Sequence, residues 1–233
     1  MSRKFEIERD YYDTGSNLYK KKTIEIKHGV TVLVGCNGIG KSTLIHQLKG
    51  RLKKENIPFI SFDNLHEGGS DSVSRNLFDG DIGFAATAMV SSEGENIIMN
   101  MSKLAGRLRE FVENGKDPKR NRFADVFRND KDEEEVEIPK ERWIFLDAID
   151  SGLSIDNVVD IKDLFNAIIE HNFGNEIYIV VSANEYEMAS GEQCFDVYNG
   201  KYVKFKDYED YRNLVMKTRE IKDYRYKKCL NVN

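Results

Sequence analysis

The sequence predicts an α/β fold with a mostly parallel sheet and an N-terminal antiparallel β part. Residues 30–34, "VTVLV", are apolar or β-branched throughout, which is typical of a strand buried on both faces. This run leads directly into a glycine-rich loop and then a helix-compatible stretch. Farther along the chain, strand-like runs alternate with helical patterns, and this order favours a parallel sheet.

The remaining elements follow from hydrophobic periodicity. Two short β-like runs, residues 4–8 and 21–26, form the N-terminal β part. A helix-compatible stretch follows the glycine-rich loop at residues 44–52, and an apolar stripe at helical spacing predicts another helix through Ile98, Met101, Leu104, Leu108 and Phe111. Further strands are expected at 57–62 (buried), 142–147, 176–182, 194–198 and 201–205, and helices at 156–171 and 207–228.

Length and composition indicate one soluble domain spanning residues 1–233, with a charged insertion at 115–140 and a charged C-terminal helix. No apolar run approaches the roughly 18 residues needed to cross a bilayer, and the N-terminus lacks an apolar signal region, so we expect no membrane insertion. Three widely spaced cysteines indicate neither a disulfide framework nor a zinc site, so a reducing cytoplasm is expected. The net charge of −5 argues against a nucleic-acid coat but leaves room for a local basic patch.

The glycine-rich loop "GCNGIGKS" fits the pattern G-x-x-x-x-G-K-[ST], with fixed points at Gly35, Gly40, Lys41 and Ser42. The glycines let backbone N–H groups point inward at an anion, and the following helix N-terminus adds favourable dipole charge. Lys41 is expected to reach the β- and γ-phosphates, and the Ser42 hydroxyl to bind Mg²⁺.

The longer form "GCNGIGKSTL" resembles the phosphate loop of the ATP-binding-cassette (ABC) superfamily of NTPases. Asn37 and Gly38 make this match more specific than a match to phosphate loops in general. The preceding residues look most similar to its SMC- and RecF-like recombination-repair branch. Lys41 and Ser92 lie only 51 positions apart, which implies an ABC-type head domain with a reduced helical subdomain. In this respect the chain also resembles small stand-alone bacteriophage and bacterial ATP-binding proteins. The resemblance implies that these loop residues bind ATP: Asn37, Gly38, Ile39, Gly40, Lys41, Ser42 and Thr43.

Two further motifs carry the resemblance. "SSEGEN" is similar to the ABC signature, with Ser92 and Gly94 at its Ser and second Gly positions; the same residues would also suit a helix N-cap. "WIFLD" resembles the metal-binding strand and implies that Asp147 holds Mg²⁺ together with Ser42. The residues 151–153, "SGL", resemble the dimer-facing loop of the superfamily.

Three positions depart from the pattern. Active relatives carry a catalytic Glu after the metal Asp, whereas this chain has Ala148, which can neither accept a proton nor orient water. No His stands at the end of the strand at 176–182, where the sequence offers Ser182, Ala183 and Asn184. No Gln lies between the phosphate loop and the signature, and Asp63 or Asn64 could take that place.

Two explanations stay open: either Asp150 and Glu185 supply the missing carboxylate as catalytic residues beside Lys41 and Asp147, or ATP is bound and hydrolysed slowly.

The resemblance implies an ATP-driven homodimer that acts as a switch in DNA repair, replication, recombination or defence, on DNA or a DNA-processing protein. The alternatives are a catalytically silent, ATP-sensing regulator of a partner enzyme and the ATPase subunit of a transporter. Candidate DNA contacts are Lys116, Lys119, Arg120, Arg122, Lys217, Arg219, Lys222, Arg225, Lys227 and Lys228, and candidate base-stacking residues are Tyr11, Tyr12 and Tyr19.

Overall fold

The computed structural model describes residues 1–12, 16–63, 93–118, 138–151 and 153–230, with side chains from residue 102 onward in the third range. The charged insertion at 115–140 lies largely outside these residues. So do Ser92, Asn64, Lys119, Arg120 and Arg122.

A six-stranded sheet with the order β4-β5-β6-β3-β7-β8 forms the centre of the fold. Its strands are β3 (Gly29–Val34), β4 (Phe59–Asp63), β5 (Glu141–Asp147), β6 (Glu176–Ser182), β7 (Gln193–Asp196) and β8 (Lys201–Val203). All neighbours pair in parallel except β7 and β8, which form an antiparallel edge. A separate antiparallel pair joins β1 (Ser2–Glu6) to β2 (Thr23–Lys27), so the predicted fold class is confirmed.

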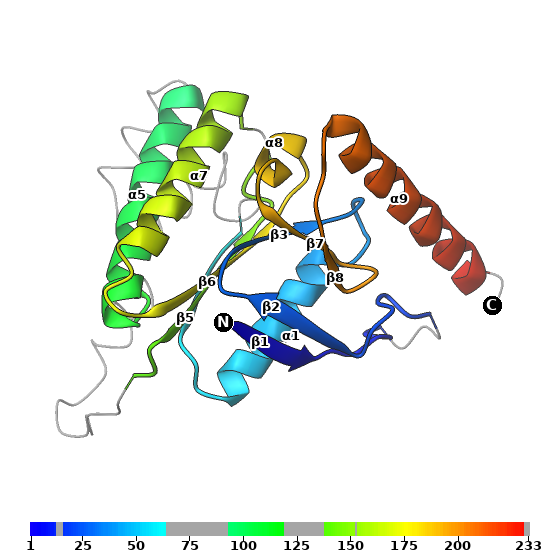
Figure 1. Cartoon of the computed structure of the whole chain (residues 1–233), viewed down its shortest axis with the longest axis horizontal. Helices are drawn as coiled ribbons and strands as arrows, with labels where there is room; N and C mark the ends of the chain where they lie inside the picture. The colour runs from blue at the N-terminus through cyan, green and yellow to red at the C-terminus, as the bar shows by residue number, and fades with distance from the viewer. Residues whose placement is uncertain (13–15, 64–92, 119–137, 152, 231–233) are drawn as a thin grey trace.

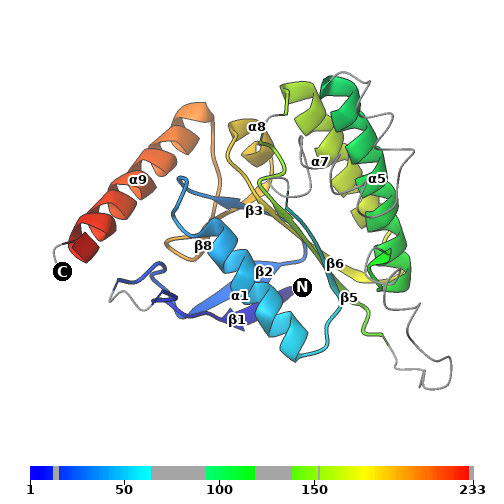
Figure 2. The ribbon, with the colours of Figure 1, turned by 180° about the vertical axis from the view of Figure 1, so that it is seen from behind.

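Helices cover both faces of the sheet (Figures 1 and 2). On one face lie α5 (Glu93–Asn114) and α7 (Ile155–Glu170), with the short α8 (Tyr186–Ala189) near them. On the other face lie α1 (Lys41–Lys54) and the β1–β2 pair. The last helix, α9 (Tyr208–Leu230), lies beyond the β7–β8 side of the sheet and ends near the segment between β1 and β2.

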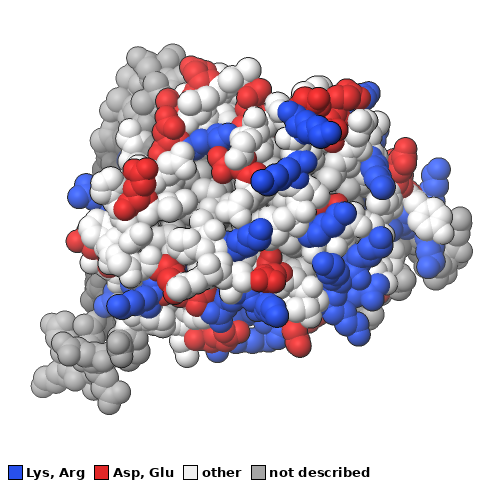
Figure 3. All heavy atoms as spheres, in the orientation of Figure 1, with Lys and Arg blue, Asp and Glu red and all other residues white. Residues whose placement is uncertain are grey.

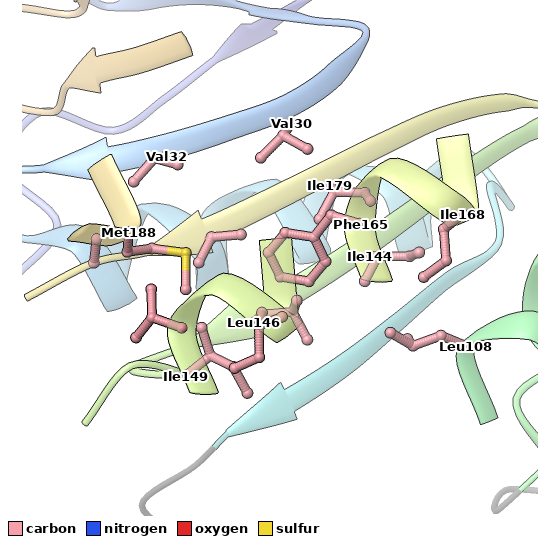
Figure 4. Close-up of a cluster of buried hydrophobic side chains, with 14 of the residues drawn as sticks. Val30, Val32, Leu108, Ile144, Leu146, Ile149, Phe165, Ile168, Ile179 and Met188 are labelled. Atoms are coloured by element: carbon pink, nitrogen blue, oxygen red, sulfur yellow. The ribbon is translucent and has the colours of Figure 1, made fainter. Parts of the chain in front are cut away.

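Each face has its own hydrophobic core because successive strand residues point to opposite sides. Toward α5 and α7, apolar residues of β3, β5 and β6 pack against buried helix residues such as Leu108 and Phe165 (Figure 4). Toward α1, Trp143 and Phe145 of β5 pack with Leu44 and Leu48 and with the β1–β2 pair. The uninterrupted burial of β3 and β5 follows from this double coverage, as expected for central parallel strands.

Two sequence expectations need correction. The strand expected as buried at residues 57–62 is β4, which forms one edge of the sheet and is only half-buried except at Ile60. The short helix α8 was not expected, because four residues are too few to show a helical period. No helix among the described residues is long and apolar enough to span a membrane.

Candidate phosphate-loop site

The glycine-rich loop joins the end of β3 to the start of α1. Gly38 and Gly40 adopt φ values of +79° and +118°, which side chains with a Cβ rarely adopt. The first turn of α1 contains no acidic residue, so nothing within that turn offsets the positive end of the helix dipole. The loop and the helix N-terminus therefore have the backbone form of a phosphate site.

Lys41 is the first residue of α1, and its side chain reaches back to the start of the loop. Its side chain is buried, and its Nζ donates to the carbonyl of Gly35 at 2.9 Å and to Asn37 Oδ1 at 3.5 Å. Burial lowers the pKa of the Lys41 ammonium, whereas the charges of Asp150 and Asp147 act in the opposite direction. An anion bound in the loop would stabilise this buried positive charge directly.

Asp147 ends β5 on the side of the sheet that faces α1. Ser182, at the end of β6, donates its hydroxyl hydrogen to Asp147 Oδ1 and accepts the backbone N–H of Ala148 at 2.8 Å. Ala148 has a φ of +52°, an uncommon conformation for a residue with a Cβ. Ser182 thus fixes both the Asp147 carboxylate and the residue after it.

Asp63 stands beside Asp147. The two residues are register partners in the parallel pair of β4 and β5, so both strands end together. Side chains of partnered residues lie on the same face, and neighbouring strands are about 4.8 Å apart. The sequence offered Asp63 and Asn64 as alternatives for the missing Gln position, and the register places Asp63 next to Asp147.

A pocket of about 410 Å³ opens over the phosphate loop, within the usual size range of small-molecule sites. It brings together loop residues, α1, the ends of β5 and β6, and the segment before β2. Its lining consists of Tyr12, Leu18, Asn37, Gly38, Gly40, Lys41, Ser42, Thr43, Asp147, Ala148, Ser151, Ser182 and Asn184. Of the predicted loop residues, only Ile39 points elsewhere, because its side chain is fully buried under the loop.

The oxygen-bearing side chains that line this pocket are suitable ligands for Mg²⁺. Ser42 and Asp147 come from different elements and present hydroxyl and carboxylate oxygens to the same space. Mg²⁺ is usually held by one or two carboxylates together with substrate phosphates and water. In such a complex Ser42 and Asp147 would hold the ion, which would neutralise phosphate charge.

The three candidate base-stacking tyrosines differ in their exposure and in whether they line the pocket. Tyr12 is 61% exposed, lines the pocket, and its hydroxyl lies 3.1 Å from Thr43 Oγ1. Tyr19 is buried and donates to the carbonyl of Gly40 at 2.9 Å, so it supports the loop from beneath. Tyr11 makes edge contacts with Tyr12 and His46 and does not line the pocket.

Asp150 and Glu185 are not placed to face a substrate. The Asp150 side chain is fully buried, and its Oδ2 accepts the backbone N–H groups of Asn184 and Glu185 at 2.7 and 2.8 Å. Its Oδ1 has no hydrogen-bond partner among the residues that the structure describes, and burial raises the pKa of this carboxyl group. Glu185 is exposed, and neither residue lines the pocket. Asp150 therefore ties the loop after β5 to the loop after β6.

Of the two predicted signature residues, Ser92 lies outside the described residues, and Gly94 lies in the first turn of α5.

One contact of the loop was missed by sequence analysis. The backbone N–H of Cys36 donates to Thr218 Oγ1 of α9 at 2.9 Å, and both residues are buried. The sequence contains only a weak indication that this helix packs against the rest of the protein: Tyr211 and Thr218 are seven residues apart in a highly charged helix, so they lie on one face of it.

The fold and the pocket together define a phosphate-loop α/β domain. No protein-family model matches the chain, and no curated protein matches its sequence.

Several solved structures show limited similarity to it. cbiO1 from Clostridium perfringens, part of the ABC transporter complex cbiONQ, is 21% identical, with 91% of this chain and 94% of that chain covered and a TM-score of 0.42. MJ1267, an ATP-binding cassette of an ABC transporter in its ADP conformation, is 16% identical, with 85% and 89% covered and a TM-score of 0.39. A DNA replication initiation factor is 11% identical, with 86% of this chain but only 45% of that chain covered and a TM-score of 0.34. At these identities and TM-scores the neighbours assign this chain no activity.

Proposed function

We propose that this chain, as a single domain, binds MgATP in the phosphate-loop pocket and acts as an ABC-type nucleotide switch, closest to the SMC- and RecF-like branch. One observation carries the proposal: Lys41, Ser42 and Asp147 line one pocket, whereas the neighbouring base position is Ala148. The site has the groups that hold a nucleoside triphosphate and Mg²⁺ but lacks the side chain that would activate water.

Slow hydrolysis follows from the pocket lining. Asp147 is engaged by Ser182, and Asp150 and Glu185 do not line the pocket. Removing a positioned general base usually lowers the rate by about 10²–10⁴. ATP would therefore stay bound long enough to stabilise a conformational or oligomeric state.

The switch would be a homodimer closed over the nucleotide. Ile155 and Val159, one turn apart at the start of α7, are 65% and 50% exposed although both are apolar. They follow Ser151, which lines the pocket rim. A second copy covering this surface would bury both side chains.

The proposed partner of the closed dimer is DNA. On the described surface, Lys and Arg gather around the end of α9 and the neighbouring N-terminal segment (Figure 3). Arg225 donates to the carbonyl of Leu18 at 3.1 Å, which brings α9 beside the exposed Lys20, Lys21 and Lys22. Lys227 and Lys228 extend this basic surface, which is opposite in sign to the chain as a whole.

Purified protein should bind MgATP, dimerise on binding it, and turn over slowly. Ile155→Glu should weaken dimerisation while leaving ATP binding to the monomer intact. Phe173→Glu, at the other end of α7 and 52% exposed, is the matched control. Size-exclusion chromatography with light scattering and an ATPase assay give both readouts, and a monomer at saturating MgATP contradicts the dimer.

DNA binding should require ATP and weaken steeply with salt. Lys227→Gln with Lys228→Gln should lower DNA affinity, whereas Lys53→Gln with Lys54→Gln, at the exposed end of α1, should not. Failure to bind any nucleic acid with ATP present would favour the second candidate, a silent ATP-sensing regulator. Ala148 also favours that candidate, and it predicts ATP-dependent capture of a single partner enzyme.

A further inference from the structure

Helix α9 contacts three separate segments that line the nucleotide pocket. Near its start, the hydroxyl of Tyr211 donates to the carbonyl of Asn184 at 3.0 Å. In its middle, Thr218 accepts the N–H of Cys36, the second residue of the phosphate loop. Near its end, Arg225 donates to the carbonyl of Leu18 at 3.1 Å and approaches the carbonyl of Ile39 at 3.5 Å.

These contacts come from one face of α9. Tyr211, Thr218, Lys222 and Arg225 repeat at intervals of three, four and seven residues, so they form one stripe along the helix. Lys222 continues the stripe over the loop itself: a Cβ on Gly38 would stand 3.3 Å from Lys222 Cδ. The helix therefore lies along the phosphate loop, and the pocket lining includes none of its described residues.

The Thr218 contact is the central one. Cys36 and Thr218 are only 6% and 2% exposed, so no water can replace this hydrogen bond without opening the helix. Thr218 also donates to the carbonyl of Val215 at 2.8 Å, which orients its oxygen toward Cys36. A buried N–H that loses its acceptor is costly, and the loop would move to satisfy it.

We propose that α9 is a positioning element for the phosphate loop: Thr218 holds the loop in its nucleotide-binding conformation, and nucleotide occupancy in turn tightens the docking of α9. The coupling is reciprocal, because a ligand that favours one loop conformation favours the helix position that accompanies it. The C-terminal half of α9 also carries Lys227, Lys228 and the exposed Tyr224 and Tyr226, so this half would transmit the nucleotide state to the surface. This inference rests on the proposed binding of MgATP.

Thr218→Val tests the inference directly, because valine keeps the shape of threonine but lacks the acceptor oxygen. MgATP affinity measured by calorimetry should fall about 10-fold, the loss expected when a preorganised loop becomes a minor conformer. Thr218→Ser restores the hydroxyl and should recover most of the affinity. A thermal melt of each variant separates loss of affinity from loss of fold.

A second pair of variants tests the end of the helix. Arg225→Gln removes the contacts with Leu18 and Ile39, and it should weaken MgATP binding less than Thr218→Val does. Arg212→Gln is the matched control, because Arg212 is exposed and pairs with Glu209 on the same helix. The control should bind MgATP like the unmodified protein. Should Thr218→Val fail to fold, the Arg225 and Arg212 pair decides the question.

Hydrogen exchange supplies a readout that a purely structural contact would not move. In the unmodified protein, MgATP should slow exchange of the amides of residues 211–228, and Thr218→Val should abolish this nucleotide-dependent protection. If the unmodified protein binds no MgATP, the proposed function is wrong. If it binds MgATP normally but Thr218→Val matches it in both affinity and protection, only this inference is overturned.

Discussion

Asp63 and Asp147 end neighbouring parallel strands as register partners, so their side chains lie on the same face of the sheet, and Asp147 lines the phosphate-loop pocket. The resemblance implied that Ser42 and Asp147 hold the metal ion, and Asp63 or Asn64 was offered for the place of the missing Gln. Asp63→Asn should raise the Mg²⁺ concentration needed for ATP binding by about 10-fold, the lower end of effects for groups that support a metal ligand.

A Mg²⁺ titration of nucleotide binding gives this measurement. Asp147→Asn should have the larger effect, and Asp160→Asn, on the exposed side of α7, should have none. An unchanged Mg²⁺ dependence in Asp63→Asn would remove Asp63 from the metal site.

Ala148 stands where the resemblance to ABC ATPases would place a catalytic Glu. Because Ala148 lines the pocket, Ala148→Glu should place a carboxylate near the phosphates and increase ATP turnover, by up to about 10²-fold. Ala148→Gln, of equal size but unable to accept a proton, is the control and should stay slow. Brisk turnover in the unmodified protein that survives Asp150→Asn together with Glu185→Gln would show that the base lies elsewhere.

Asp150 anchors two pocket loops by accepting two backbone N–H groups at its Oδ2. Asp150→Asn keeps a side-chain oxygen that can accept both backbone hydrogen bonds, whereas Asp150→Ala leaves both N–H groups without this acceptor. The alanine variant should therefore lose about 2–4 kcal/mol of unfolding free energy, and the asparagine variant much less. Urea unfolding of both variants at one pH measures the difference.

The pH dependence of stability gives a separate test of Asp150. Burial raises the pKa of its carboxyl group above the ordinary value near 3.8, so the native state holds this proton more tightly than the unfolded state does. Stability from this group is thus greatest at low pH and decreases as pH rises from the ordinary pKa toward the raised one. Asp150→Asn removes this component, and identical pH profiles for the two proteins would contradict the assignment.

Tyr12 is the one candidate base-stacking residue that lines the pocket. Tyr12→Ala should weaken ATP binding by about 10-fold, because stacking of a base on an aromatic ring is worth about 1–3 kcal/mol. Tyr12→Phe keeps the ring and should bind almost normally. Tyr19→Ala should instead lower the free energy of unfolding by about 3–5 kcal/mol, because Tyr19 is buried beneath Gly40. Calorimetric ATP titration and thermal unfolding separate the two effects.

The sequence alone determined the features that depend on local order. A buried strand, a loop of fixed glycine spacing and a helix follow one another in "VTVLVGCNGIGKS", so the phosphate loop could be predicted with its residues. The alternation of apolar runs and helical stripes predicted the parallel sheet and the helix faces, since burial on both faces leaves a continuous apolar pattern. The absence of a Glu after Asp147 was also visible in the sequence itself.

Only the tertiary structure decided which distant residues meet. Asp63 reaches Asp147 through strand register, and Thr218 reaches Cys36 across 182 residues, and no local pattern encodes either contact. The same holds for Asp150. Its spacing from Asp147 suggested a substitute base, but its carboxylate accepts hydrogen bonds from two backbone N–H groups. Side-chain roles at this site depend on the packing of separate elements, which sequence order does not fix.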